Sequence, residues 1–140
     1  MREVISTGDA PGSPLFSQAV RVGDQIFVSG MAGIDVGTGR PPGPTIQEQT
    51  RQSLANCRAV LEAAGAGLDD VVEVGILLAD PDDFAGMNEE WVRWFPTDPP
   101  ARYAARLGPV LPGVLISIRM TAVRSSSGSR PQAAGATVEE

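Results

Sequence analysis

The sequence predicts an α+β domain in which two helices pack on one face of a β-sheet. Strand-like and helical segments follow one another in the order strand, strand, helix, strand, helix, strand, strand. Each helical segment carries a single apolar stripe, and packing both stripes on the same sheet face is the simplest way to bury them. The last strand alternates apolar and polar residues, so one of its two faces belongs to the core.

The N-terminal third predicts an irregular arm followed by a hairpin. Residues 1–15 contain two glycines and two prolines, which favours irregular structure. Strand-like runs cover residues 18–22 and 25–30, and Gly23-Asp24 between them suits a tight hairpin turn. Residues 34–44 are rich in glycine and proline and predict a loop.

Two helices are expected in the middle of the chain. Thr45 and Glu48 have the spacing of a capping box, and an apolar stripe follows until glycines stop the helix. That stripe consists of Leu54, Cys57, Leu61 and Ala64. A largely apolar strand over residues 70–79 precedes the second helix, which Asp80 caps with proline behind it. The second stripe, expected in the core or at an interface, consists of Phe84, Met87, Trp91 and Phe95.

Two more strands complete the domain. They are expected over residues 101–107 and 115–123, and in the second strand Ser117 and Arg119 share the polar face. That face meets either water or another copy of the chain, and the long apolar strand favours a copy. Residues 1–124 therefore form one domain, and residues 125–140 predict a disordered tail without a packing stripe.

Composition excludes several function classes. A net charge of −6 and a pI of 4.6 disfavour nucleic acid as a partner. The 11 basic residues are all arginines, which removes Schiff-base lysines, and the absence of histidine removes imidazole catalysis and histidine-containing metal sites. Cys57 is the only cysteine, so no intrachain disulfide forms. Without an apolar run of signal-peptide or membrane length, we expect a cytoplasmic protein that has no membrane partner.

One stretch predicts an anion site. Arg102, Ala104 and Arg106 share one face of a strand that begins only after the double proline at residues 99 and 100. Small neighbours leave room for a guanidinium to make two-point contact with a carboxylate. An arginine at the start of a strand is nevertheless most often a solvated or ion-paired surface residue, and from composition alone that interpretation leads.

The whole pattern resembles the RidA family, also called YjgF/YER057c/UK114. Five pieces carry the resemblance in the family's order and spacing, and together they span roughly residues 15–124. They are residues 16–30, 48–65, 71–72, 84–88 and 100–102. The resemblance implies a chorismate-mutase-like subunit with a mixed β-sheet, a homotrimer, and ligand clefts between subunits.

The resemblance also implies an activity and its residues. Well-studied members hydrolyse reactive enamine or imine acids to 2-keto acids and ammonia without a cofactor or a metal, so the expected ligand is a small carboxylate-bearing imine or enamine. Arg102 matches the arginine that holds the substrate carboxylate, and Ser117 takes the place of the family's water-positioning glutamate. The other implied substrate-binding residues are Phe16, Gly30, Asn88, Ala104 (through its backbone) and Arg119.

Two departures from the family leave alternatives open. Ser117 cannot accept a proton at neutral pH as a carboxylate can, and Phe16 replaces a pocket tyrosine. A deaminase with an altered substrate range remains the leading hypothesis. The alternatives are a non-catalytic trimer that binds a small carboxylate and a specialised enzyme of a biosynthetic pathway. The sequence alone leaves the substrate open, as well as whether Arg106 and Arg119 face the cleft.

Overall fold

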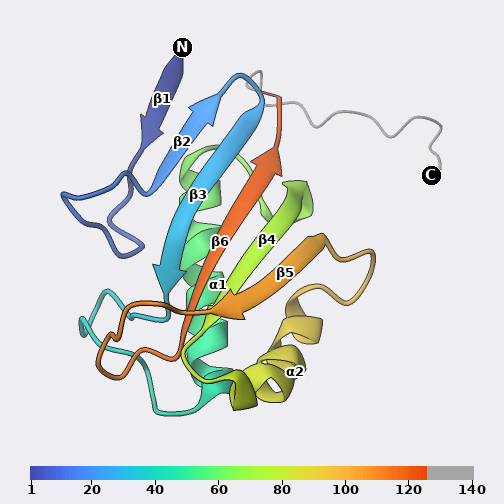
Figure 1. Ribbon diagram of the computed structural model, residues 1–140. Helices are drawn as coiled ribbons and strands as arrows, with labels where there is room; N and C mark the ends of the chain where they lie inside the picture. The colour runs from blue at the N-terminus through green and yellow to red at the C-terminus, as the bar shows by residue number, and fades with distance from the viewer. Residues whose placement is uncertain (126–140) are drawn as a thin grey trace.

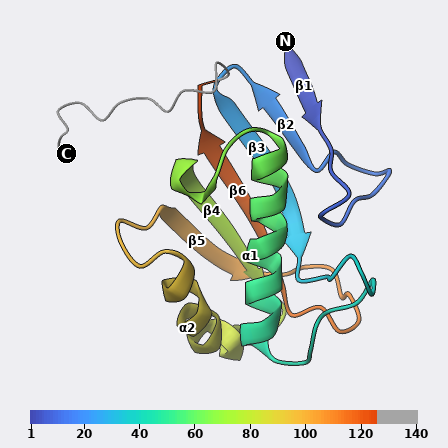
Figure 2. The ribbon, with the colours of Figure 1, turned by 180° about the vertical axis from the view of Figure 1, so that it is seen from behind.

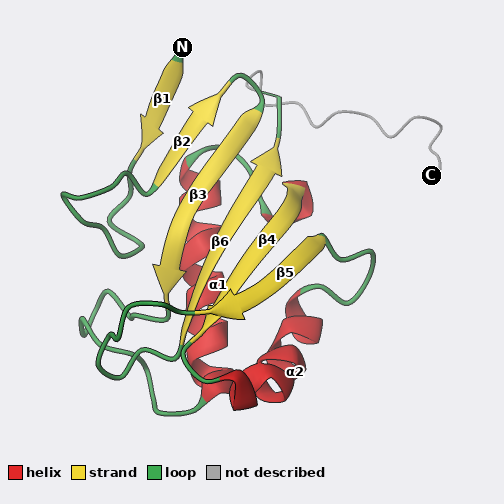
Figure 3. Cartoon of the chain, in the orientation of Figure 1, coloured by secondary structure: helices red, strands yellow, loops and turns green. Residues whose placement is uncertain are grey.

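The computed structural model describes residues 1–125, so the tail predicted over residues 125–140 lies, apart from Ser125, outside the described residues. Within that range the chain folds into two layers, a sheet and a pair of helices (Figures 1 and 3). None of the helices among residues 1–125 combines the length and apolar character needed to cross a membrane.

The sheet has six strands in the order β1-β2-β3-β6-β4-β5. The strands are β1 (Arg2–Ile5), β2 (Ala19–Val22), β3 (Gln25–Ala32), β4 (Val71–Leu78), β5 (Ala101–Arg106) and β6 (Ile116–Val123). Only β4 and β5 pair in parallel, and the other neighbours are antiparallel, so the sheet is mixed. A crossover through the second helix makes the parallel pair possible. It also leaves β5 at one edge of the sheet.

Both helices cover the same face of the sheet, which confirms the predicted fold class. They are α1 (Ile46–Ala63) and α2 (Phe84–Trp94), and Figure 2 shows them in front of the strands. Short 3-10 turns, Leu68–Asp70 and Pro81–Asp83, lead into β4 and α2. The capping box of Thr45 and Glu48 is present at the start of α1. Asp80 also caps as expected, but the element it caps is the 3-10 turn that precedes α2.

The core lies between the sheet and the helices. In β6 the residues Ile116, Ile118, Met120 and Ala122 are fully buried. Ser117 and Arg119 alternate with them and are only partly buried, so they lie on the face that no helix covers, called here the open face. Burial raises the pKa of the Cys57 thiol to about 12, which keeps it protonated at neutral pH.

The structure corrects the prediction for the N-terminal arm. The arm over residues 1–15 is not irregular throughout, because Arg2–Ile5 forms the edge strand β1 and pairs with β2. After β1 the buried side chain of Gln18 holds the arm by donating to the carbonyls of Thr7, Ala10 and Pro11. Phe84, expected in the core or at an interface, is 44% exposed in a single chain and so lies outside the core.

A second buried glutamine fixes the loops at the end of the molecule that carries the site. Gln49 on α1 donates to the carbonyls of Gly43 and Gly113 and accepts a hydrogen bond from the Leu115 amide at 2.9 Å. These bonds give two loops, far apart in sequence, the polar partners that buried backbone groups require. They hold the segment between β5 and β6 against α1.

Candidate functional site

The guanidinium of Arg102 lies against α2 on the helix-covered side of the sheet. Arg102 is the second residue of the edge strand β5 and pairs with Val74, whose side chain is buried under the helices. Its Nη1 donates to Asn88 Oδ1 at 2.8 Å. Its Cζ lies 4.9 Å from the centre of the Trp91 ring and 5.7 Å from that of Phe84. Helical spacing brings Phe84, Asn88 and Trp91 to one side of α2, where they surround the charge.

The charge of Arg102 is not neutralised within the described part of the chain. Burial lowers the pKa of Arg102, because partial removal from water disfavours the charged form. No carboxylate of residues 1–125 lies within ion-pairing distance of it, whereas Arg51, Arg93, Arg119 and Arg124 each have one. A partly desolvated cation with donors to spare is suited to binding an anion. Within residues 1–125, Arg102 is therefore not the ion-paired surface residue that composition alone favoured.

The backbone of β5 offers further polar groups beside Arg102. The amide of Leu107 donates to Leu78 of β4, and backbone groups alternate in direction along a strand. The N–H and C=O of Ala104 therefore point toward the free edge of the sheet. A hollow of about 430 Å³ adjoins this edge. Its lining consists of Leu78, Pro81, Phe84, Ala104, Ala105 and Arg106.

The remaining predicted site residues lie on the open face or beside it. Gly30 sits at a bulge in β3, where an added Cβ would approach Ser117 Oγ to 2.8 Å. Only glycine, or a shift of Ser117, fits there. Phe16 is 48% exposed and lies on the arm close to Gly30, since Ser29 Oγ donates to the Ser17 carbonyl at 2.5 Å.

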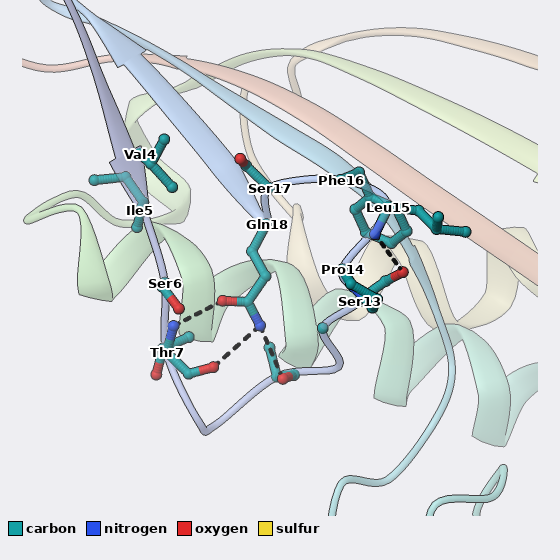
Figure 4. Close-up of a pocket in the computed structure, with 12 residues that line it drawn as sticks. Val4, Ile5, Ser6, Thr7, Ser13, Pro14, Leu15, Phe16, Ser17 and Gln18 are labelled. Atoms are coloured by element: carbon teal, nitrogen blue, oxygen red, sulfur yellow. Dashed lines mark hydrogen bonds between the residues drawn. The ribbon is translucent and has the colours of Figure 1, made fainter.

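The arm that carries Phe16 encloses a pocket of its own. This pocket has a volume of about 550 Å³. Figure 4 shows Phe16 and Leu15 on one side of it and the Gln18 side chain on the other. The Gln18 amide is already bonded to the arm on both its oxygen and its nitrogen. The polar groups of the pocket therefore serve the arm's own backbone, and nothing in it points to a ligand.

Arg119 is engaged on the open face. Its Nη1 lies 3.7 Å from Glu73 Oε1, and its Nη2 is 3.5 Å from Thr121 Oγ1. Tyr103 of β5 occupies the same face, where its phenol ring covers Gly75 so closely that a Cβ there would clash. Arg106, by contrast, makes no ion pair with any carboxylate of residues 1–125.

One chain thus brings the predicted site residues together in two separate groups. Arg102, Asn88 and the Ala104 backbone lie at the β5 edge on the helix side. Gly30, Ser117 and Arg119 lie on the open face. The rings of Phe84 and Trp91 were predicted as core or interface, and their contact with Arg102 was missed. The spacing of Phe84, Asn88 and Trp91 at intervals of four and three residues could have indicated it.

A buried carboxylate holds α2 in place beneath this site. Glu90 is 3% exposed and accepts from Arg51 Nε at 3.2 Å, from Arg51 Nη2 at 3.1 Å and from Trp94 Nε1 at 2.9 Å. Burial by itself would raise the pKa of Glu90, but these hydrogen bonds and the charges of Arg51 and Arg93 outweigh burial and lower it. Glu90 therefore joins α2 to α1 and indirectly positions Asn88.

We expect Glu90→Gln to lower the free energy of unfolding at pH 7 by about 1–3 kcal/mol, because it removes a charged acceptor from buried donors. A carboxylate whose pKa is lowered in the folded state stabilises the fold above its unfolded pKa and ceases to do so as pH falls through the folded pKa. The difference between variant and wild type should therefore shrink below the ordinary value of 4.5. Urea unfolding at pH 7 and pH 4 measures both effects. The neighbouring Glu89→Gln is the control, and equal losses in the two variants would contradict the assignment.

Comparisons with known proteins agree with the resemblance seen in the sequence. The family model described as endoribonuclease L-PSP matches residues 7–124, which includes the range of the resemblance. A RutC family protein of Pyrococcus horikoshii is 42% identical over 126 residues, which cover 89% of this chain and 99% of the relative. The human 2-iminobutanoate/2-iminopropanoate deaminase is 37% identical over 125 residues, covering 89% of this chain and 91% of the human protein.

Solved structures agree with the sequence matches. E. coli TdcF, solved with bound serine, superposes with a TM-score of 0.81 at 31% identity, covering 88% of this chain and 99% of that one. RidA from an Antarctic Psychrobacter gives a TM-score of 0.79 at 34% identity, covering 86% of this chain and 98% of that one. The structural matches thus cover a similar share of the chain to the sequence matches.

Proposed function

Because the chain belongs to the endoribonuclease L-PSP family, also known as the YjgF/RidA family, we propose that it hydrolyses reactive enamine or imine acids to 2-keto acids and ammonia. The observation that carries this proposal is the state of Arg102. Its guanidinium is partly desolvated, held by Asn88 at 2.8 Å and unpaired with any carboxylate of residues 1–125. The imine deaminase name of the human relative and the serine bound to TdcF support a small amino or imino acid as the ligand class.

The proposed reaction needs few catalytic groups. Water adds to the carbon of the C=N bond to give an amino alcohol, and expulsion of ammonia from that carbon leaves the 2-keto acid. Arg102 holds the carboxylate, and the outward backbone groups of Ala104 contact the nitrogen. Ser117 hydrogen-bonds the attacking water. Since an imine is already electrophilic, orientation of substrate and water supplies most of the rate enhancement.

We place the complete site between copies of the chain, as a homotrimer would allow. Arg102 and Ser117 lie on opposite faces of the sheet, so a second copy has to bring its open face to the β5 edge. Exposed apolar side chains on the open face support burial there, among them Val4, Phe27 and Tyr103, which are 55%, 39% and 45% exposed. The unpaired edge of β5 is likewise a surface that proteins usually cover.

The assembly has a direct test. Only an oligomer unites the two groups, and the family resemblance implies a trimer. Light scattering coupled to size exclusion should therefore give a mass of three times the 14.6 kDa subunit. Phe27→Arg should shift the mass toward the subunit value, since it places a charge in the buried interface. Val92→Arg, which alters an exposed apolar residue of α2, is the control. A wild-type mass equal to one subunit at working concentration would contradict the shared site.

Loss of the carboxylate anchor should reduce turnover sharply. We expect Arg102→Ala to lower kcat/KM for freshly generated 2-iminobutanoate by about 10- to 100-fold, the effect of losing hydrogen bonds to a charged group. Arg102→Lys should retain part of the activity because a point charge remains. Arg58→Ala is the control, since Arg58 also stacks on a tryptophan, at 4.9 Å from Trp94. Keto-acid release is the measurement, and equal rates for wild type and Arg102→Ala would remove the assignment.

Ser117 supports a second candidate, a trimer that binds a small carboxylate without turning it over. A hydroxyl can orient water but cannot take its proton at neutral pH. Endoribonuclease activity, which the family description names, is disfavoured by a net charge of −6 and by the absence of histidine.

Restoring the carboxylate separates the two candidates. We expect Ser117→Glu to raise kcat by about 10- to 1,000-fold, since positioned general bases typically contribute 10²–10⁴. Thr121→Glu is the control, because it adds the same charge to the open face four residues further along β6. Tight calorimetric binding of a 2-keto acid with no turnover in wild type and a gain in Ser117→Glu favours the binding protein. Measurable turnover in wild type favours the enzyme.

A further inference from the structure

Arg106 and the hollow beside it indicate where the side chain of a ligand would lie. Arg106 pairs with Leu78 as Arg102 pairs with Val74, and both β4 partners are buried under the helices. The two arginines therefore face the same side of β5, with Ala104 between them. Their Cα atoms are about 13 Å apart along the strand, at roughly 3.3 Å per residue. Long flexible stems let both guanidinium groups reach toward a ligand lying over Ala104.

The hollow beside Arg106 is mostly apolar. Of its lining residues Leu78, Pro81, Phe84, Ala104, Ala105 and Arg106, only Arg106 is charged. Phe84 connects the hollow to the carboxylate anchor, because its ring is also 5.7 Å from the Arg102 guanidinium. A ligand held by Arg102 at one end would therefore extend its chain over the alanine side chains and the Phe84 ring toward Arg106.

Arg106 is available to bind a second anion. Three acidic residues lie close in sequence to the hollow, at Asp80, Asp82 and Asp83, yet none is within ion-pairing distance of Arg106 in residues 1–125. An arginine at the rim of an apolar hollow is exposed and hydrated when empty, and a carboxylate entering the hollow can pair with it in two-point geometry.

We propose that Arg106 is a specificity-determining residue that selects ligands with a second carboxylate at the end of a short methylene chain, such as 2-imino dicarboxylic acids. This inference rests on the proposed function, since it takes Arg102 as the anchor of the first carboxylate. Arg106 does not contact the reacting carbon, so its effect is on selection between substrates.

Calorimetry with two stable keto acids of equal length tests the inference without turnover. 2-Oxoglutarate and 2-oxopentanoate differ only in the terminal group, a carboxylate or a methyl. Wild type should bind the dicarboxylate more tightly. In Arg106→Ala the Kd of 2-oxopentanoate divided by the Kd of 2-oxoglutarate should fall by about 1.5- to 5-fold, the range for an exposed ion pair. Arg40→Ala, an exposed loop arginine, changes the net charge equally and should leave the ratio unchanged. A ratio near one in wild type, or an equal ratio in Arg106→Ala, overturns the inference.

Turnover separates this inference from the proposed function. The same ratio is measured for kcat/KM with the corresponding imino acids, freshly generated by an amino-acid oxidase. If neither imino acid is hydrolysed, the deaminase proposal fails while the Kd ratio still decides the role of Arg106. If both imino acids are hydrolysed and Arg106→Ala leaves the ratio of their kcat/KM values unchanged, the deaminase proposal stands and the proposed role of Arg106 is wrong.

Discussion

The charge of Arg102, which no carboxylate of residues 1–125 compensates, is the constraint on which the candidate site depends. Removing a guanidinium from water has a cost, and the protein offsets it with an amide oxygen at 2.8 Å and two aromatic faces, none of which carries a full negative charge. In the proposed function, a carboxylate ligand would supply the negative charge that pairs with Arg102. The offset requires α2 to sit close to β5, and the buried Glu90 secures α2 by accepting from Arg51 and Trp94. The anchor and its support therefore belong to one network that crosses both helices.

Arg102 and Ser117 lie on opposite faces of the sheet. Alternation along a strand sends Arg102 toward the helices, and the same rule sends Ser117 away from them. No rotamer of either side chain can bring them together through the sheet. A chemistry that needs both is possible only where the β5 edge of one copy meets the open face of another. The outward backbone of Ala104 lies at the β5 edge, so in the proposed assembly its polar groups would face the second copy.

Local chemistry made much of the fold predictable, and long-range pairing accounts for what was missed. The capping box at Thr45 and the alternation in β6 depend on neighbours in sequence, and both are present in the structure. β1 was missed because its ladder depends on β2, which follows after a glycine- and proline-rich arm. The pairing of Arg119 with Glu73 joins two strands across a bulge, and the hollow beside Arg106 depends on where the 3-10 turn starts α2. Neither arrangement has a local signature.

Ser117 cannot accept the proton of the attacking water, but the substrate nitrogen can partly replace the missing acceptor. When water adds to an imine, the nitrogen becomes a basic amine, so the proton released by water has an acceptor within the substrate. A positioned carboxylate typically adds 10²–10⁴ in rate by taking that proton early. A hydroxyl that only orients water forgoes this factor but keeps the benefit of alignment. A site built on Arg102 and Ser117 is therefore expected to be slow rather than inert. A slow deaminase differs from a binding protein in that it hydrolyses the imine faster than the imine hydrolyses spontaneously.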